Sequence, residues 1–370
     1  MNQKIVKQIS GAALKLFFML AFWFALMLIV FPAQRQAAPV MAEADIPVNA
    51  VQDVGEVVTP VSPKLIPLGK TTGIKMFSQG TMIVGFADLQ GCGDTSPAKA
   101  AGLQMGDVII AVDAEEIDSN EDLVEALQTL DDETAVFTVR RDDAQLDVTV
   151  NAYYDPQTES WRIGAWVRDS IAGIGTITFV DPANGAFGAL GHGICDADTG
   201  ELMPFEKGSI MGSSVVDVKK GKSGAPGELN GAFDMTCDQG TLYANTHQGI
   251  FGQITDEAVY AHEKAVEIAA KDEIRTGKAT VLCNVEGTQR EVFDIEIEKV
   301  YQDSDENVRD MLIRVTDKEL LKLTGGIVQG MSGSPIIQDG KLVGAVTHVL
   351  VNDPTRGYGI FIENMLEAAE

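Results

Sequence analysis

From residue 153 onward, short apolar stretches alternate with turn residues, and this pattern restricts the fold more than any other feature of the chain. Ile174–Val180 and Phe187–Leu190 flank the turn sequence Asp-Pro-Ala-Asn-Gly, while Pro335–Ile337 and Leu342–Val351 flank Gln-Asp-Gly-Lys. Both arrangements predict β-hairpins. A series of short strands separated by turns is typical of a barrel or a sandwich. We therefore expect residues 153–370 to form a mainly β domain.

A serine, Ser332, lies among small residues in Gly330–Pro335, directly before one of the predicted strands. A nucleophilic serine needs an accessible hydroxyl and backbone N–H groups that can bind an oxyanion. Ser334 is a rival, but the proline that follows it has no N–H to donate. The N–H groups of Gly330 and Ser332 are the better donors. The sequence therefore predicts Ser332 as a nucleophile, with these two N–H groups as its oxyanion hole.

The loop resembles the Gly-Asp-Ser-Gly-Gly-Pro loop of chymotrypsin-like proteases, with Met in place of Asp and Ser in place of the second Gly of the pair. Upstream, Gly188–Gly193 places His192 at the end of an apolar run. The order of histidine and then serine is also that of the chymotrypsin-like enzymes. The resemblance implies two small barrels, with His192 on one and Ser332 on the other.

The N-terminal segment contains an uninterrupted apolar run over residues 16–31, which follows Lys4, Lys7 and Lys15. Its length lies between that of a signal peptide and that of a full membrane span of roughly 20 residues. Lysines before such a run predict that the N-terminus stays inside and the remainder is outside the cytoplasm. We expect a signal-anchor or transmembrane segment over 1–32 and a linker rich in Ala, Pro and Val over 33–66.

The composition limits the partners and cofactors. The net charge is −26 at pH 7, which would repel the phosphates of a nucleic acid and which suits an extracytoplasmic domain. The four cysteines match no zinc motif and are too few to form a disulfide framework in a chain of 370 residues. We expect no metal, no cofactor and mostly free, buried thiols at Cys92, Cys195, Cys237 and Cys283.

Residues 67–152 form a separate unit, in which a strand at Thr81–Phe86 precedes the sequence SPAKAAGLQMGDVIIAVD. A helix at about 119–130, capped by Ser119, and a closing strand at Ala135–Arg140 follow. The unit resembles a PDZ domain, and PDZ domains bind extended peptides by strand addition. The resemblance implies a carboxylate loop and an edge strand at Gly73 and Ile74. In the alternative reading, the unit only packs on the protease.

The apolar N-terminal segment, the PDZ unit, the sequence FGALGHGICDADTG and the run from Val315 to Leu366 together resemble the stage IV sporulation protein B peptidases. These are serine peptidases of endospore-forming bacteria. The resemblance implies limited proteolysis of the protein itself and of a partner, the inhibitory subunit of an intramembrane protease. Cleavage there leads to activation of a late mother-cell sigma factor. The expected location is the space between the forespore membranes.

By position, the resemblance assigns the roles of general base to His192, of nucleophile to Ser332 and of acid to Asp317. His348 is the second choice for the base because it lies in a strand close to the serine in sequence, and His247 is another. Thr316–Glu319 also has the pattern of a capping box, in which Asp317 would only stabilise a helix. Asp196 and Asp294 are alternatives for the acid.

Two other functions compete with a signalling peptidase. One is a PDZ scaffold with an inactive protease fold, against which the intact histidine and serine argue. The other is a quality-control protease of the trypsin-plus-PDZ type. In those enzymes the PDZ domain follows the protease, whereas here it precedes it. Labelling by a fluorophosphonate would exclude the scaffold, and degradation of casein would favour quality control.

Overall fold

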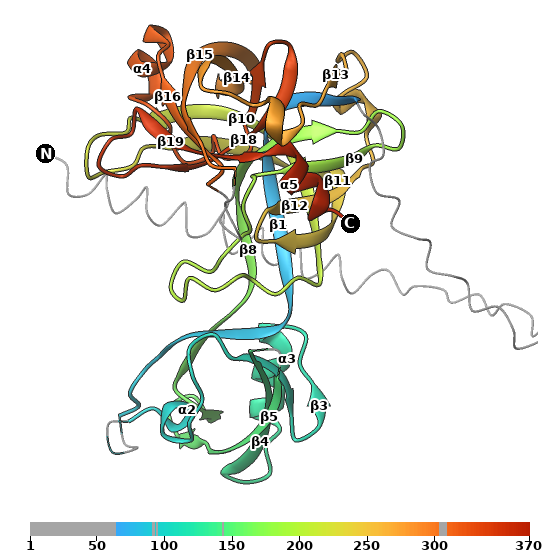
Figure 1. Cartoon of the computed structure of the whole chain (residues 1–370). Helices are drawn as coiled ribbons and strands as arrows, with labels where there is room; N and C mark the ends of the chain where they lie inside the picture. The colour runs from blue at the N-terminus through green and yellow to red at the C-terminus, as the bar shows by residue number, and fades with distance from the viewer. Residues whose placement is uncertain (1–63, 91–92, 94, 143, 303–308) are drawn as a thin grey trace, which may run out of the picture. The chain divides into compact units, whose positions relative to one another are not determined.

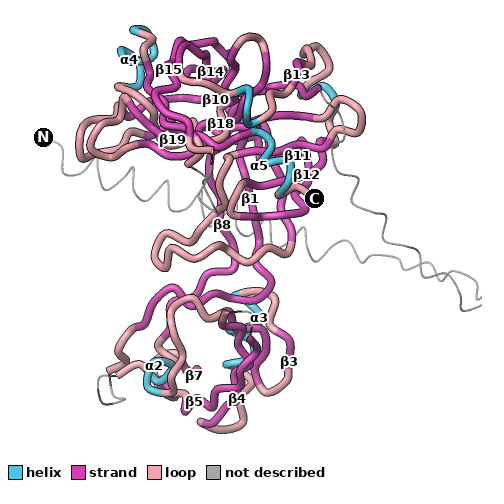
Figure 2. The backbone as a smooth tube through the Cα atoms, in the orientation of Figure 1, coloured by secondary structure: helices cyan, strands magenta, loops and turns pink. Residues whose placement is uncertain are grey.

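The computed structural model describes residues 64–370 apart from 91–92, 94, 143 and 303–308, and strands dominate it (Figures 1 and 2). The expected membrane segment and residues 33–63 of the expected linker lie outside the described residues. Among the described residues, no helix has the length and apolar character needed to span a membrane. Residues 64–66, which the sequence places at the end of the linker, begin the first strand.

The first barrel consists of six antiparallel strands. The pairing order is β1-β8-β9-β12-β11-β10, and the pairing of β10 with β1 closes the ring. Its core is apolar and includes Ile177, Phe187 and Ile250. The strands are β1 (Lys64–Phe86), β8 (Ala165–Val180), β9 (Ala186–Ala189), β10 (Lys207–Lys219), β11 (Glu228–Thr246) and β12 (Gly249–Ile254).

The second barrel is also closed, with the order β14-β15-β16-β19-β18-β17. Phe293, Ile295 and Ile297 in β15 point into its core, which their alternation with acidic residues predicts. Two helices accompany the barrel, α4 (Lys318–Thr324) and α5 (Ile362–Glu367). The strands are β14 (Gly277–Glu286), β15 (Gln289–Val300), β16 (Met311–Val315), β17 (Pro335–Gln338), β18 (Lys341–Val349) and β19 (Arg356–Phe361).

The PDZ unit has its own core around Ile83, Phe137 and Ile163. Helix α3 (Asn120–Gln128) begins as predicted, because the Ser119 side chain accepts a hydrogen bond from the backbone N–H of the third residue of the helix. The other elements are α2 (Pro97–Ala100), β2 (Val108–Val112), β3 (Glu115–Glu116), β4 (Thr134–Arg141), β5 (Ala144–Asn151), β6 (Tyr153–Asp155) and β7 (Ser160–Arg162).

Strands β1 and β8 belong to both the first barrel and the PDZ unit. Residues 72–77 of β1 pair with β10 and β8 in the barrel, whereas residues 81–82 pair with β2 of the PDZ unit. The core of the PDZ unit continues to Val167. The structure therefore divides the chain differently from the sequence-based boundaries of 67–152 and 153–370. The PDZ unit is inserted into the first barrel, between its first and second strands.

Residues 255–275, which the sequence leaves ambiguous, form short elements. They are a 3₁₀ turn at Glu257–Val259, the strand β13 (Val266–Glu267) and a second 3₁₀ turn at Lys271–Glu273. The three described cysteines are unpaired. Cys283 is buried as expected, and burial raises the pKa of its thiol, whereas Cys195 and Cys237 are exposed.

Candidate active site

Ser332 lies in the tight turn that precedes β17, and its hydroxyl donates a 2.8 Å hydrogen bond to the carbonyl of Thr347. The next residue, Gly333, has φ +93°. A Cβ there would lie 2.1 Å from the carbonyl oxygen of Thr176 in the first barrel, so only glycine fits. The turn therefore holds the serine where the two barrels touch.

The backbone of this turn leaves two N–H groups available for an oxyanion. The hydroxyl of Thr176 donates a 2.8 Å hydrogen bond to the Gly330 carbonyl. The backbone N–H of Thr176 donates a 3.1 Å hydrogen bond to the Ser332 carbonyl. Among the hydrogen bonds of the described residues, neither the N–H of Gly330 nor that of Ser332 is used. Both are the donors that the sequence predicts. Thr176 has no signal in the sequence, because its role depends on contact between the barrels.

His192 follows β9 in a turn where Leu190 and Gly191 both have φ +68°. Its Nδ1 lies 2.8 Å from the carbonyl oxygen of Gly193. A carbonyl only accepts, so Nδ1 carries the proton in the neutral ring and Nε2 has a free lone pair. Burial lowers the pKa of His192, although the bond to Gly193 acts against this shift. The ring is therefore neutral at pH 7 and able to accept a proton.

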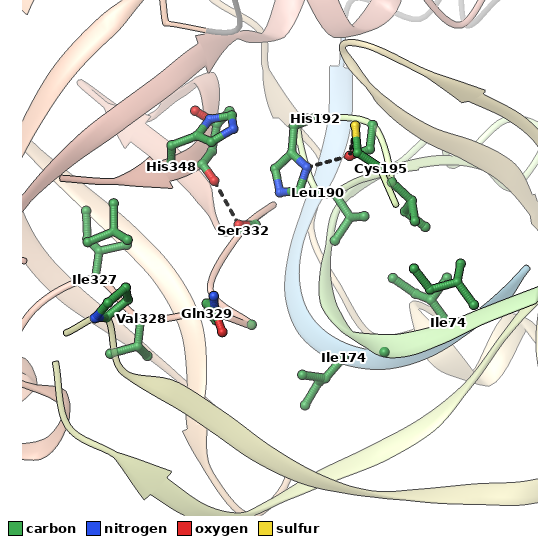
Figure 3. Close-up of a pocket in the computed structure, with 18 of the residues that line it drawn as sticks. Ile74, Ile174, Leu190, His192, Cys195, Ile327, Val328, Gln329, Ser332 and His348 are labelled. Atoms are coloured by element: carbon green, nitrogen blue, oxygen red, sulfur yellow. Dashed lines mark hydrogen bonds between the residues drawn. The ribbon is translucent and has the colours of Figure 1, made fainter. Parts of the chain in front are cut away.

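One cavity of about 440 Å³ brings His192, Gly330, Ser332 and His348 together (Figure 3). The rings of His192 and His348 are 5.0 Å apart. Burial, together with the neighbouring His192 and Arg309, lowers the pKa of His348 to about 4. His192 lies beside Ser332, with one ring nitrogen turned toward the serine and the other toward Gly193 (Figure 3).

The two rival residues of the sequence analysis lie elsewhere. Ser334 is completely buried, its hydroxyl has no partner among the described residues, and it does not line the cavity. The side chain of His247 is exposed, and its carbonyl accepts from the N–H of Gly193 at 3.2 Å. The geometry favours Ser332 over Ser334 and leaves His348 as the second histidine of the site.

The structure does not bring Asp317 together with His192 and Ser332. Asp317 is the N-cap of α4, where its carboxylate accepts from the N–H of Glu319 at 2.8 Å and of Leu320 at 3.0 Å. Partial burial disfavours the charged form, but these bonds keep the pKa of Asp317 below its ordinary value. The capping role that the sequence pattern allows is therefore occupied, and the carbonyl of Gly193 stands where an orienting acid would bind Nδ1.

The other two candidate acids do not line the cavity with His192 and Ser332 either. The buried carboxylate of Asp196 forms an ion pair with Arg168 and accepts from the N–H of Thr199. Asp294 lies on the exposed face of β15, and its carbonyl accepts from the N–H of Asp317 at 3.0 Å. Among the described residues, no cluster of His, Cys, Asp or Glu is arranged to hold a metal ion.

The predicted peptide-binding edge at Gly73 and Ile74 is not free. Gly73 pairs with Met211 of β10 on one side and with Ile174 of β8 on the other. A strand with two neighbours cannot accept a third by addition. The prediction is wrong because residues 64–77 complete the first barrel instead of the PDZ unit.

A groove of about 430 Å³ in the PDZ unit lies between α3 and the beginning of β8. Leu123, Val124 and Leu127 of α3 line one side, while Ala165 and Val167 of β8 line the other. Residues 165–168 pair with β1 along one edge, and no described strand pairs with their other edge. This groove has the apolar lining and the free edge that the Gly73 segment lacks.

Models of two protein families match the chain. The family model of the SpoIVB peptidase S55 matches residues 159–366. The model of the PDZ domain matches residues 90–152. No protein with a curated description matches the chain significantly.

Several solved protease structures resemble the chain at low identity. The Rv3671c protease of M. tuberculosis in its active form is 16% identical, with a TM-score of 0.31 over 54% of this chain and 73% of that one. The structure titled "HtrA-type protease AlgW with decapeptide" is 11% identical, with a TM-score of 0.34 over 85% of this chain and 66% of that one.

Proposed function

The chain belongs to the SpoIVB peptidase S55 family and is a serine peptidase with a PDZ domain, and from this premise we propose that it cleaves its substrates with Ser332 and His192. The observation that carries the proposal is the cavity that contains both side chains, one from each barrel. No other serine among the described residues lines this cavity.

In the proposed mechanism the hydroxyl of Ser332 turns from the Thr347 carbonyl toward Nε2 of His192. His192 takes the hydroxyl proton while the oxygen attacks the substrate carbonyl, and it then gives the proton to the leaving amine. The N–H groups of Gly330 and Ser332 bind the oxyanion. Hydrolysis of the acyl-enzyme by a water, activated by His192, completes the cycle. Asp317 has no part in this mechanism, because its carboxylate caps α4 and does not line the cavity.

The biological role that we propose is limited proteolysis in sporulation signalling. Residues 1–32 would anchor the enzyme in the membrane, with the peptidase outside the cytoplasm, between the forespore membranes. Its substrates would be its own chain and the inhibitory subunit of an intramembrane protease, whose cleavage activates a late mother-cell sigma factor. The apolar run over 16–31 and the family support this role.

The test compares Ser332→Ala with Ser334→Ala in the full chain, measuring self-cleavage and cleavage of the co-expressed membrane complex. Ser332→Ala should lose both activities, on the order of 10⁶-fold in rate. Ser334→Ala is a matched control, because it removes a buried hydroxyl that has no partner. Unchanged processing in Ser332→Ala would refute the assignment, and general degradation of casein by the wild type would favour a quality-control protease.

We also propose that the groove between α3 and β8 binds an extended segment, either the part of the linker that precedes β1 or the tail of a partner. A peptide that adds to the free edge at residues 165–168 would place apolar side chains against Leu123 and Leu127. A tethered linker has an effective concentration in about the millimolar range, so weak binding suffices. The PDZ domain would thus restrict which segments reach the active site.

A further inference from the structure

The cavity around Ser332 carries no formal charge from acids, lysines or arginines. None of the described residues that line it is Asp, Glu, Lys or Arg, although the chain has 54 acidic and 28 basic residues of these types. Its titratable side chains are His192, His348 and Cys195. Because burial lowers the pKa of both histidines, they are neutral at pH 7. The cavity therefore holds no counter-ion for a charged substrate side chain.

The cavity has two apolar walls, and Ser332 lies between them. Ile327 and Val328, both buried, lie on one side of Ser332, and Ile74, Ile174 and Leu190 lie on the other (Figure 3). Val349, the last residue of the strand that carries Thr347 and His348, packs against the same core as Ile327 and Val328. Val351 also lines the cavity. A peptide whose scissile carbonyl meets Ser332 would thus place side chains against both walls.

Contact with such walls favours the binding of apolar substrate side chains over charged ones. An apolar side chain gains transfer free energy in proportion to the area that it buries. A carboxylate, ammonium or guanidinium loses its hydration there and finds no opposite charge. Even a single methylene in an apolar pocket is commonly worth about 10-fold in kcat/KM or more. The difference between a leucine and a lysine should exceed this.

Building on the proposed function, we propose that the peptidase selects cleavage sites by apolar residues next to the scissile bond, and that the wall of Ile327, Val328, Val349 and Val351 sets this choice. Substrates with Leu, Ile, Val, Met or Phe at that position are cleaved, and those with Lys, Arg, Asp or Glu are not. This selection also limits proteolysis, because such residues are mostly buried in folded proteins.

The test incubates the full-length protein with a pool of synthetic 14-residue peptides and identifies the new termini by mass spectrometry. At one or both positions flanking the cleaved bond, the five apolar residues should be enriched at least about 10-fold over the four charged residues. The Val351→Asp variant places a carboxylate in the wall, at a side chain that is 48% exposed and so tolerates it. It should raise cleavage next to Lys or Arg by about 10-fold or more.

The matched control is Val292→Asp, which makes the same change at an exposed valine of β15 outside the cavity. It should keep the wild-type cleavage profile. Fluorophosphonate labelling of Ser332 in the same samples separates the two proposals. If Ser332 is labelled but charged residues flank cleaved bonds as often as apolar ones, or no peptide is cleaved, the specificity is refuted and the nucleophile stands. If Ser332 is neither labelled nor needed for cleavage, the proposed function fails, and this inference with it.

Discussion

At the scale of single residues, the chemistry depends on the protonation of His192. The carbonyl of Gly193 fixes the proton on Nδ1, and burial keeps the ring neutral. This arrangement replaces part of what an orienting carboxylate does in a triad, namely the choice of tautomer. It does not supply the negative charge that stabilises the protonated ring, so we expect a modest rate.

The first prediction concerns pH. The base works when it is neutral, so kcat/KM should fall as the pH drops through the pKa of His192. That pKa is lowered from its ordinary value of 6.5, and the acidic limb of the profile should have its midpoint below 6.5. The profile of a peptide substrate between pH 4 and 8 provides the measurement. A midpoint above 6.5 would mean that an acidic group raises the pKa of His192, as a triad would.

The second prediction separates the two roles of Asp317. Asparagine caps helices about as well as aspartate does, whereas Asp317→Ala should lose about 1 kcal/mol of unfolding free energy. From the position of Asp317 at the start of α4, we expect Asp317→Asn to keep its melting temperature and its turnover within about 10-fold. A turnover reduced about 10⁴-fold, with an unchanged melting temperature, would instead assign Asp317 to the orientation of His192.

At the scale of elements, local patterns predict local structures well. Ser119 and the alternating residues of β15 define a helix start and a strand face through neighbours in sequence, and both predictions are confirmed. The partner of a strand is decided by distant residues. Gly73 and Ile74 have the sequence of a PDZ loop, but the closure of the barrel between β8 and β10 determines their position.

The third prediction tests the groove between α3 and β8. Val124 lines the groove and is 53% exposed, so Val124→Glu should fold normally and place a charge where a peptide would lie. Processing of the membrane-bound partner should slow by about 10-fold or more, while cleavage of a short peptide should not change. Val136→Glu, at an exposed valine of β4 outside the groove, is the control. Equal loss of both activities in Val124→Glu would make the PDZ unit a structural support only.

At the scale of the whole molecule, the first barrel begins at β1, ahead of residue 153. The strand pattern predicts a barrel or a sandwich, and the resemblance to chymotrypsin-like proteases implies two barrels with His192 and Ser332 on different ones. The insertion of the PDZ unit cannot be predicted in this way, because a sequence pattern shows where a strand lies but not which sheet it completes. Contacts between the barrels, such as the hydrogen bond from Thr176 to the turn that carries Ser332, cannot be predicted from the sequence for the same reason.

The fourth prediction uses this insertion. A fragment of residues 153–370 lacks β1, which leaves β8 and β10 without their shared neighbour, and it should not fold. A chain of residues 64–370, in which an Asn-Gly turn replaces 79–168, keeps the pairing of Phe77 with Ser170 and should retain both barrels. Circular dichroism and thermal unfolding distinguish these results. A folded, active 153–370 fragment would contradict the assignment of β1 to the barrel.

The role of Ser332 as the nucleophile is tested most directly by labelling the full-length protein with a fluorophosphonate and locating the modified residue by mass spectrometry. Ser332, beside the available N–H groups of its turn and the neutral His192, should carry the label, and His192→Ala should slow labelling by at least about 100-fold. A label on another serine would show that Ser332 is not the nucleophile, and unchanged labelling of the His192→Ala variant would show that His192 is not its base.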